Sequence, residues 1–166
     1  IENKITTRTK AIMAVHIYGL PVDLDPLLNL SNKYGLKVIE DAAEAHGLHY
    51  KGRACGSFGE ISTFSFYPNK LITTGEGGIV LTNDEGLYYH MRRSSSHGIT
   101  VDRKLMKKDL GPWYYEQIQL GYNYRITDLQ CALGLSQLKK LELFKIKRRD
   151  IVNRYNQAFR DLPYLI

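Results

Sequence analysis

Three reactive side chains lie at or after the ends of two predicted strands. Asp41 is the last residue of the predicted strand 36–41, and Ser65 lies near the end of the predicted strand 61–66. Lys70 stands five residues beyond Ser65, in a loop. In open α/β sheets, functional groups collect at the carboxyl ends of the strands. We therefore expect an acid, a hydroxyl and an amine near one edge of a sheet.

Taken singly, these residues leave two interpretations open. Asp41 fits either a helix cap or a ligand contact. Lys70 fits either a surface lysine beside a turn or a desolvated amine that forms a Schiff base. Taken together, they match pyridoxal phosphate, which needs an acid at its pyridine nitrogen, a lysine at its aldehyde, and hydroxyl or backbone donors at its phosphate. Asp41, Lys70 and Ser65 fill these roles in that order.

Other ligand sites find little support in the sequence. The glycine cluster 75–78 lacks a following Gly-Lys-Ser/Thr and precedes a strand, which argues against a nucleoside triphosphate loop. Neither the five histidines nor the pair Cys55 and Cys131 has metal-ligand spacing, so we expect no metal and no disulfide framework. No stretch approaches the roughly 18 apolar residues of a membrane helix, and no signal peptide is evident. We expect a cytoplasmic protein without a membrane partner.

The elements that must position these side chains follow an α/β pattern. An apolar strand at 11–17, a helix from 23 to 34 that Gly35 ends, and a strand at 36–41 form a βαβ unit, which predicts a parallel sheet. The remaining predicted elements are strands at 61–66 and 78–82, a helix capped at Asp84 that runs to about 96, a long excursion over 98–124, and a long helix that begins at a Thr127–Gln130 capping box and runs towards 161.

The basic charge lies mainly in one segment. The chain has 166 residues and a formal net charge of +6, with an apolar fraction of 43% that is typical of a globular protein. Residues 139–154 contain seven basic and two acidic side chains, interleaved with apolar residues at roughly helical spacing. This segment fits either the solvated face of an amphipathic helix or a surface that binds a polyanion.

Four stretches carry a family resemblance. They are Val38–Gly47, Phe64–Lys70, Ile72–Gly78 and Gly121–Asp128. In their order and spacing, the sequence resembles the DegT/DnrJ/EryC1/StrS sugar-nucleotide aminotransferases, within the fold-type I pyridoxal-phosphate enzymes. The resemblance implies the central part of the large domain of an aspartate-aminotransferase-like α/β fold, a mostly parallel sheet flanked by helices.

The resemblance also implies roles for individual residues. Lys70 would hold the cofactor as a Schiff base and then move the proton between the substrate carbon and the cofactor. Asp41 would keep the pyridine nitrogen protonated, and Glu44 would face the phenolic oxygen of the cofactor. Ser65 would bind the phosphate. Asn123 would reach the phosphate of a partner subunit, which implies a homodimer with shared active sites.

The finer resemblance concerns the substrate. The stretches 96–99, 111–117 and 120–125 are similar to transaminases of pseudaminic acid synthesis, which implies a UDP-linked 4-keto-6-deoxy sugar and L-glutamate as the amino donor. GDP-perosamine synthases are the alternative within the family. Lys70 argues against a related sugar dehydratase, in which a histidine replaces the lysine. The alternative from another class is a non-catalytic regulatory or nucleic-acid-binding module that uses the basic helix, although we expect no nucleic-acid partner.

The resemblance covers only part of the length of the family members. We expect residues 1–125 to be part of the cofactor-binding large domain, and residues 126–166 to form a long helix that leads to a C-terminal small domain. The chain is then a fragment of a larger enzyme, and we expect it to be inactive alone.

Overall fold

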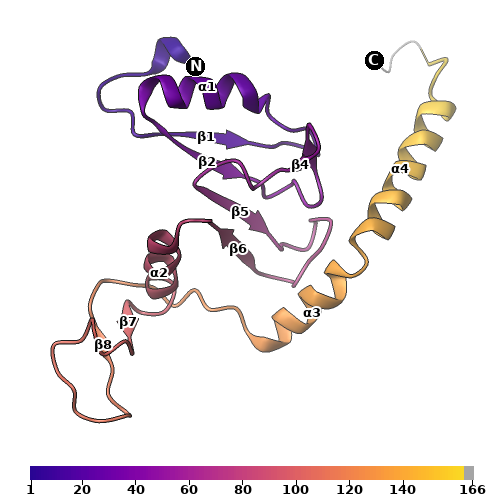
Figure 1. Cartoon of the computed structure of the whole chain (residues 1–166). Helices are drawn as coiled ribbons and strands as arrows, with labels where there is room; N and C mark the ends of the chain where they lie inside the picture. The colour runs from indigo at the N-terminus through magenta and orange to yellow at the C-terminus, as the bar shows by residue number, and fades with distance from the viewer. Residues whose placement is uncertain (163–166) are drawn as a thin grey trace.

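A four-stranded sheet forms the centre of the computed structural model, which describes residues 1–162 (Figure 1). The strand order is β1-β2-β5-β6; the first two pairings are parallel, and β6 pairs with β5 in the antiparallel direction. The predicted α/β class with a mostly parallel sheet is therefore confirmed. The strands of this sheet are β1 (Ala11–Val15), β2 (Lys37–Asp41), β5 (Ile61–Ser65) and β6 (Gly78–Leu81).

Helix α1 (Leu24–Tyr34) makes the crossover between β1 and β2. It ends where the prediction placed its end, because Gly35 adopts a left-handed conformation (φ 62°) and its N–H bonds to carbonyls of the last turn. Leu24 is fully buried on the inner face of α1 and packs with Val38 of β2, in a core that also contains residues of β1. This packing holds β2 in the middle of the parallel part of the sheet.

Two small hairpins project from the sheet. Strands β3 (His49–Tyr50) and β4 (Arg53–Ala54) form the first, between β2 and β5. Helix α2 (Glu85–Ser94) follows β6, and the Asp84 side chain caps it by accepting the Leu87 N–H at 2.7 Å. The segment predicted as an excursion then contains the second hairpin, formed by β7 (Ile99–Thr100) and β8 (Glu116–Gln117).

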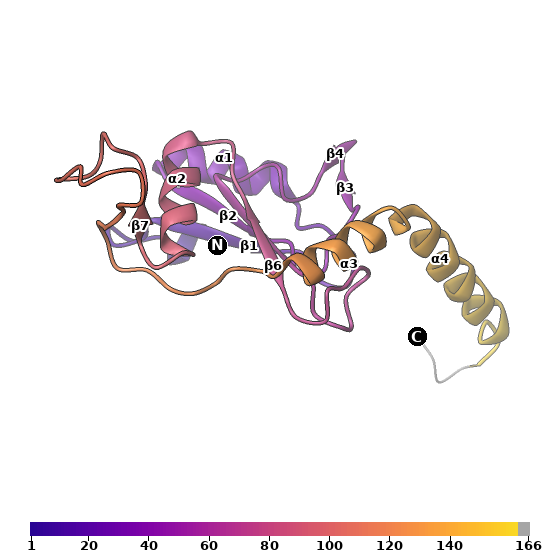
Figure 2. The same ribbon diagram turned by 90° about the horizontal axis from the view of Figure 1, so that it is seen from below.

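The C-terminal part is two helices, α3 (Asp128–Leu138) and α4 (Leu141–Ala158), which extend away from the sheet (Figures 1 and 2). The capping box at Thr127 and Gln130 is confirmed. The prediction of one long helix is wrong, because Lys140 leaves the helical conformation (φ −103°, ψ 2°) and α4 starts afresh after it. No glycine or proline marks the break in the sequence. Helix α4 ends at Ala158, a few residues before the predicted end near 161.

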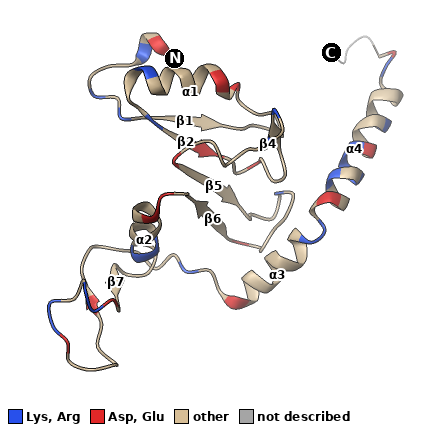
Figure 3. Ribbon diagram, in the orientation of Figure 1, with Lys and Arg blue, Asp and Glu red and all other residues tan. Residues whose placement is uncertain are grey.

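The basic segment falls largely on α4, where lysines and arginines recur along the helix (Figure 3). Among the helices of residues 1–162, none is long and apolar enough to cross a membrane. Within the same residues, no group of three or more His, Cys, Asp or Glu side chains is arranged to hold a metal ion.

Candidate active site

Asp41 lies at the carboxyl end of β2, with Val15 of β1 on one side and Thr63 of β5 on the other. One of its carboxylate oxygens, Oδ1, accepts the N–H of Ala43 at 3.1 Å. Within residues 1–162, Oδ2 accepts no hydrogen bond. The central parallel strand therefore presents a half-buried carboxylate with one oxygen available to a ligand.

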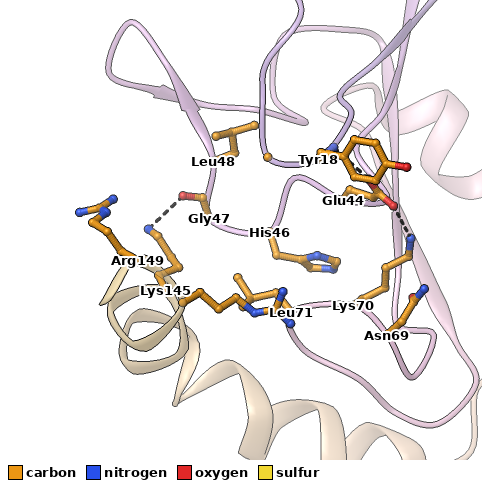
Figure 4. Close-up of a pocket in the computed structure, with 12 residues that line it drawn as sticks. Tyr18, Glu44, His46, Gly47, Leu48, Asn69, Lys70, Leu71, Lys145 and Arg149 are labelled. Atoms are coloured by element: carbon orange, nitrogen blue, oxygen red, sulfur yellow. Dashed lines mark hydrogen bonds and ion pairs between the residues drawn. The ribbon is translucent and has the colours of Figure 1, made fainter. Parts of the chain in front are cut away.

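Glu44 and Lys70 form an ion pair beside Asp41. The Lys70 Nζ lies 3.0 Å from the Glu44 Oε1, and the other carboxylate oxygen accepts the backbone N–H of Tyr18 at 2.9 Å (Figure 4). The N–H of Tyr18 and, after it, the ammonium of Lys70 lower the pKa of Glu44. The Lys70 side chain is only 16% exposed, so this amine is held largely out of water with a carboxylate as its partner.

Asp41, Glu44 and Lys70 line one cavity of about 340 Å³, together with the turn that follows β1. Glu44 and Lys70 also line a neighbouring cavity of about 490 Å³, which reaches α4. Both volumes are in the range of small-molecule sites. The structure thus brings together three of the five predicted site residues, from β2, from the loop after it, and from the loop after β5.

Hydrogen bonds within the loop 66–74 hold the segment that carries Lys70. The Thr74 N–H donates to the carbonyl of Phe66 at 3.0 Å, and the Lys70 N–H donates to the carbonyl of Tyr67 at 3.0 Å. The Thr73 hydroxyl adds a bond to the carbonyl of Phe66 at 2.9 Å. These bonds give the amine a defined position at the sheet edge.

Ser65 and Asn123 are not among the residues that line the two cavities. The Ser65 Oγ, at the end of β5, accepts the N–H of Tyr67 at 3.2 Å, and within residues 1–162 its O–H donates no hydrogen bond. Asn123 lies in the segment after β8, where it forms a β-bridge with Ser96. The phosphate-binding roles of both residues stay predictions.

A buried carboxylate that we did not assign a role precedes Asp41. Glu40 is fully buried and accepts three backbone N–H groups from residues 56–59 at 2.6–2.7 Å. It also accepts the Nε2–H of His16 at 3.1 Å, while the Nδ1 of this ring accepts the N–H of Val22. The backbone N–H of His16 donates to the carbonyl of Asp41 at 3.0 Å. Glu40 and His16 therefore hold the turn with Tyr18 against the strand end with Asp41.

His46 is a second residue that the prediction left without a role. Its ring is 8% exposed and lies near the rings of Phe64 and Phe66, at centroid distances of 5.5 and 5.9 Å. Burial lowers the pKa of His46, which keeps the ring neutral. In the part of the chain that the structure describes, its Nε2 has no hydrogen-bond partner. His46 sat within the motif 38–47, but nothing in its spacing indicated burial.

These features define a class of protein. A carboxylate at the end of a central parallel strand, with a carboxylate–lysine pair lining the same small cavity, is the arrangement of a pyridoxal-phosphate enzyme with an aminotransferase fold. The model of the DegT/DnrJ/EryC1/StrS aminotransferase family matches residues 1–166, and the chain belongs to this family.

Similar proteins agree with this assignment. The chain is 46% identical to an uncharacterized protein of Methanocaldococcus jannaschii over 166 residues, which are all of this chain and 43% of that protein. It is 45% identical to a GDP-perosamine synthase of Escherichia coli, covering 98% of this chain and 42% of that protein. The solved structure of Helicobacter pylori PseC, an aminotransferase involved in the biosynthesis of pseudoaminic acid, matches with a TM-score of 0.89 at 38% identity, covering 99% of this chain and 42% of that one. The chain thus spans about two fifths of the length of these relatives.

Pyridoxal phosphate is the cofactor of this family, as predicted. The residues present fit it, because the cavity offers the Asp41 Oδ2 as an acceptor for a ring N–H and the Lys70 amine for an aldehyde. The ring of His46 lines the adjacent cavity, and its buried Nε2 has no hydrogen-bond partner within residues 1–162.

Proposed function

We propose that the intact protein transfers an amino group from L-glutamate to the keto group of a nucleotide-linked 4-keto-6-deoxy sugar. The observation that carries this proposal is the Lys70–Glu44 pair, which lines the same cavity at the sheet edge as the Asp41 carboxylate. Family membership supports sugar transamination in general. The reaction converts glutamate to 2-oxoglutarate in one half and the keto sugar to an amino sugar in the other.

Each residue has a task in this reaction. Bound pyridoxal phosphate supplies an aldehyde carbon and a ring that accepts electrons from the substrate carbon. The Asp41 Oδ2 accepts the hydrogen bond of a protonated ring nitrogen, and Ala43 fixes the other oxygen of the same carboxylate. The Lys70 Nζ removes the proton from the α-carbon of glutamate and, in the second half, returns a proton to the sugar carbon. Glu44 holds the amine in place through both halves.

The sugar that we propose is UDP-linked and belongs to a pseudaminic acid pathway. Support comes from the similarity to PseC of Helicobacter pylori, which extends over almost the whole chain. A GDP-linked sugar of the perosamine type is the second candidate, because the similarity to GDP-perosamine synthases reaches 45% identity over 98% of the chain. Both candidates need the same chemistry at Lys70.

We further propose a homodimer in which Asn123 serves the site of the partner. In support, Asn123 lies on the segment after β8 and does not line the cavities of its own Lys70. A cytoplasmic location and the lack of a nucleic-acid partner stay predictions.

The test is product analysis. The intact protein, loaded with pyridoxal phosphate, is incubated with L-glutamate and with a panel of UDP- and GDP-linked 4-keto-6-deoxy sugars, and the products are separated and identified by mass spectrometry. We expect 2-oxoglutarate and one amino sugar in equal amounts. A protein that binds the cofactor but aminates no member of the panel contradicts the proposal.

A further inference from the structure

Helix α4 brings positive charge to the cavity next to Lys70. Lys145, Arg148 and Arg149 line the cavity of about 490 Å³, and Figure 4 shows Lys145 and Arg149 on the side opposite Glu44 and Lys70. Its lining therefore contains four basic side chains and one carboxylate. The basic segment 139–154 thus contributes three of its side chains to the wall of a cavity.

The charges in this wall are not equally compensated. Lys70 is paired with Glu44, and the Lys145 Nζ lies 2.9 Å from a carboxylate oxygen of Glu142. Within residues 1–162, neither Arg148 nor Arg149 forms an ion pair with a carboxylate. Two guanidinium groups in the same turn of α4 therefore lack a negative partner at the cavity.

The contact between α4 and the loop after β2 fixes where these arginines lie. The Lys145 Nζ donates to the carbonyl of Gly47 at 3.0 Å. Gly47 has a positive φ of 70°, and a Cβ atom there would come within 3.2 Å of side-chain carbons of Leu141 and Lys145. The absence of a side chain at Gly47 thus permits the close approach of α4. The loop that carries Glu44 therefore contacts the helix that carries the arginines.

We propose that Arg148 and Arg149 bind the diphosphate of the nucleotide-linked sugar and direct its sugar end towards Lys70. This inference rests on the proposed function and names the subsite that would recognise the nucleotide part of that substrate. Guanidinium groups bind phosphate oxygens through paired, charge-assisted hydrogen bonds, and two adjacent groups match the two phosphates. The volume of the cavity leaves room for more than an amino acid.

The experiment uses the intact, cofactor-loaded protein and the double variant Arg148→Gln/Arg149→Gln. Binding of UDP and of GDP is measured by calorimetry, and the two half-reactions are followed separately by the visible absorbance of the cofactor. We expect the dissociation constant of the preferred nucleotide to rise roughly 10-fold for each arginine removed. The half-reaction with the sugar should slow at low sugar concentration, while that with glutamate keeps its rate.

The matched control is Lys147→Gln/Arg154→Gln, which removes the same charge from α4 at positions that do not line the cavity. An equal loss of nucleotide affinity in this control contradicts the subsite, since it would reflect the net charge of the helix alone. A slower half-reaction with glutamate and unchanged nucleotide binding also overturns it, because the anion is then the donor carboxylate. If the unmodified protein binds neither nucleotide and aminates no sugar, the proposed function fails together with the subsite. If it aminates a sugar and the double variant matches it, only the subsite fails.

Discussion

The layer of β1, α1, β2 and β5 and the arm formed by α3 and α4 are built in opposite ways. The layer contains fully buried side chains such as Leu24 and Glu40. In the arm, neither described helix has a buried residue, and Leu129 is 85% exposed. A side chain placed by a close-packed core keeps its geometry, whereas a helix with few contacts can shift at low cost.

This difference separates two tasks at one site. Asp41 and Glu44 extend from the layer. The arm carries basic side chains to the same region, and polar contacts such as that of Lys145 with Gly47 join it to the layer. We therefore expect changes in the layer to affect the chemistry and the stability. Changes in the arm should affect mainly the affinity for an anionic substrate.

Replacement of Lys70 by alanine should have the largest effect. It removes the only amine that we place at the reacting carbon, so transamination by the intact protein should fall by about 10³-fold or more, with loss of the visible absorbance of the bound cofactor. Lys147→Ala, on the arm, is the control and should leave both readouts unchanged. Cofactor that borohydride still traps on another residue of the Lys70→Ala variant would contradict the assignment.

The second prediction compares a carboxylate of the layer with one of the arm. Glu40→Ala leaves His16 and three backbone N–H groups without their buried acceptor, which should lower the free energy of unfolding by about 3–5 kcal/mol. Glu142→Ala removes a carboxylate whose side chain is 73% exposed, and it should change the free energy of unfolding little. Urea denaturation followed by circular dichroism measures both.

If the Glu40→Ala variant does not fold, it gives no denaturation curve. Glu40→Gln then provides the measurement, because it keeps the shape of the side chain and part of its acceptor capacity, and it should lose less stability. Equal losses for the Glu40 and Glu142 variants would remove the distinction between the layer and the arm.

Much of the layer could be predicted from the sequence, because its signals are local. The apolar strands of the βαβ unit and the end of α1 at Gly35 follow from hydrophobic pattern and glycine conformation, as the structure confirms. The break between α3 and α4 could not be predicted, because no residue at 139–140 forces it. Its position agrees with the close approach of Leu141 to Gly47, which lies far away in the sequence: a Cβ at Gly47 would lie 3.2 Å from a side-chain carbon of Leu141.

In the site, too, local features could be predicted from the sequence and long-range contacts could not. Asp41, Glu44 and Lys70 were predicted from strand ends and from family resemblance, and the structure brings them together. The role of Glu40 depends on backbone N–H groups of residues 56–59, which carry no side-chain signature. The arginines of α4 reach the cavity only through long-range packing, so their charge was visible in the sequence but their position was not.

The third prediction measures how strongly the arm is docked. Gly47→Ala places a Cβ at a positive φ and pushes it against Leu141 and Lys145, whereas Gly35→Ala has a similar φ of 62° and meets nothing within 4 Å. Both should lose about 1–2 kcal/mol of stability from the backbone conformation. Only Gly47→Ala should also speed cleavage of the arm by trypsin. Equal cleavage in the two variants would mean that the contact at Gly47 does not hold α4.

The smallest expected effect concerns His46, which lies between the layer and the arm. Burial, assisted by the charge of Lys70 and opposed by a backbone contact of Ser65, lowers the pKa of this ring from its ordinary value of 6.5. The unfolded chain therefore takes up a proton at His46 at a higher pH than the folded chain does. The stability that the neutral ring contributes is complete above about pH 6.5, and it is lost as the pH falls towards the lower pKa of the folded state.

His46→Phe should remove this part of the pH dependence, because phenylalanine fits beside Phe64 and Phe66 and does not titrate. Urea denaturation between pH 7.5 and pH 5, in steps of about half a unit, should show a shallower loss of stability in the variant than in the unmodified protein. His90→Phe, on exposed α2, is the control and should keep the original slope. A slope unchanged by His46→Phe would show that the ring is hydrated in solution. The buried part of the layer would then not include His46, and this ring would be as accessible to water as the side chains of the arm.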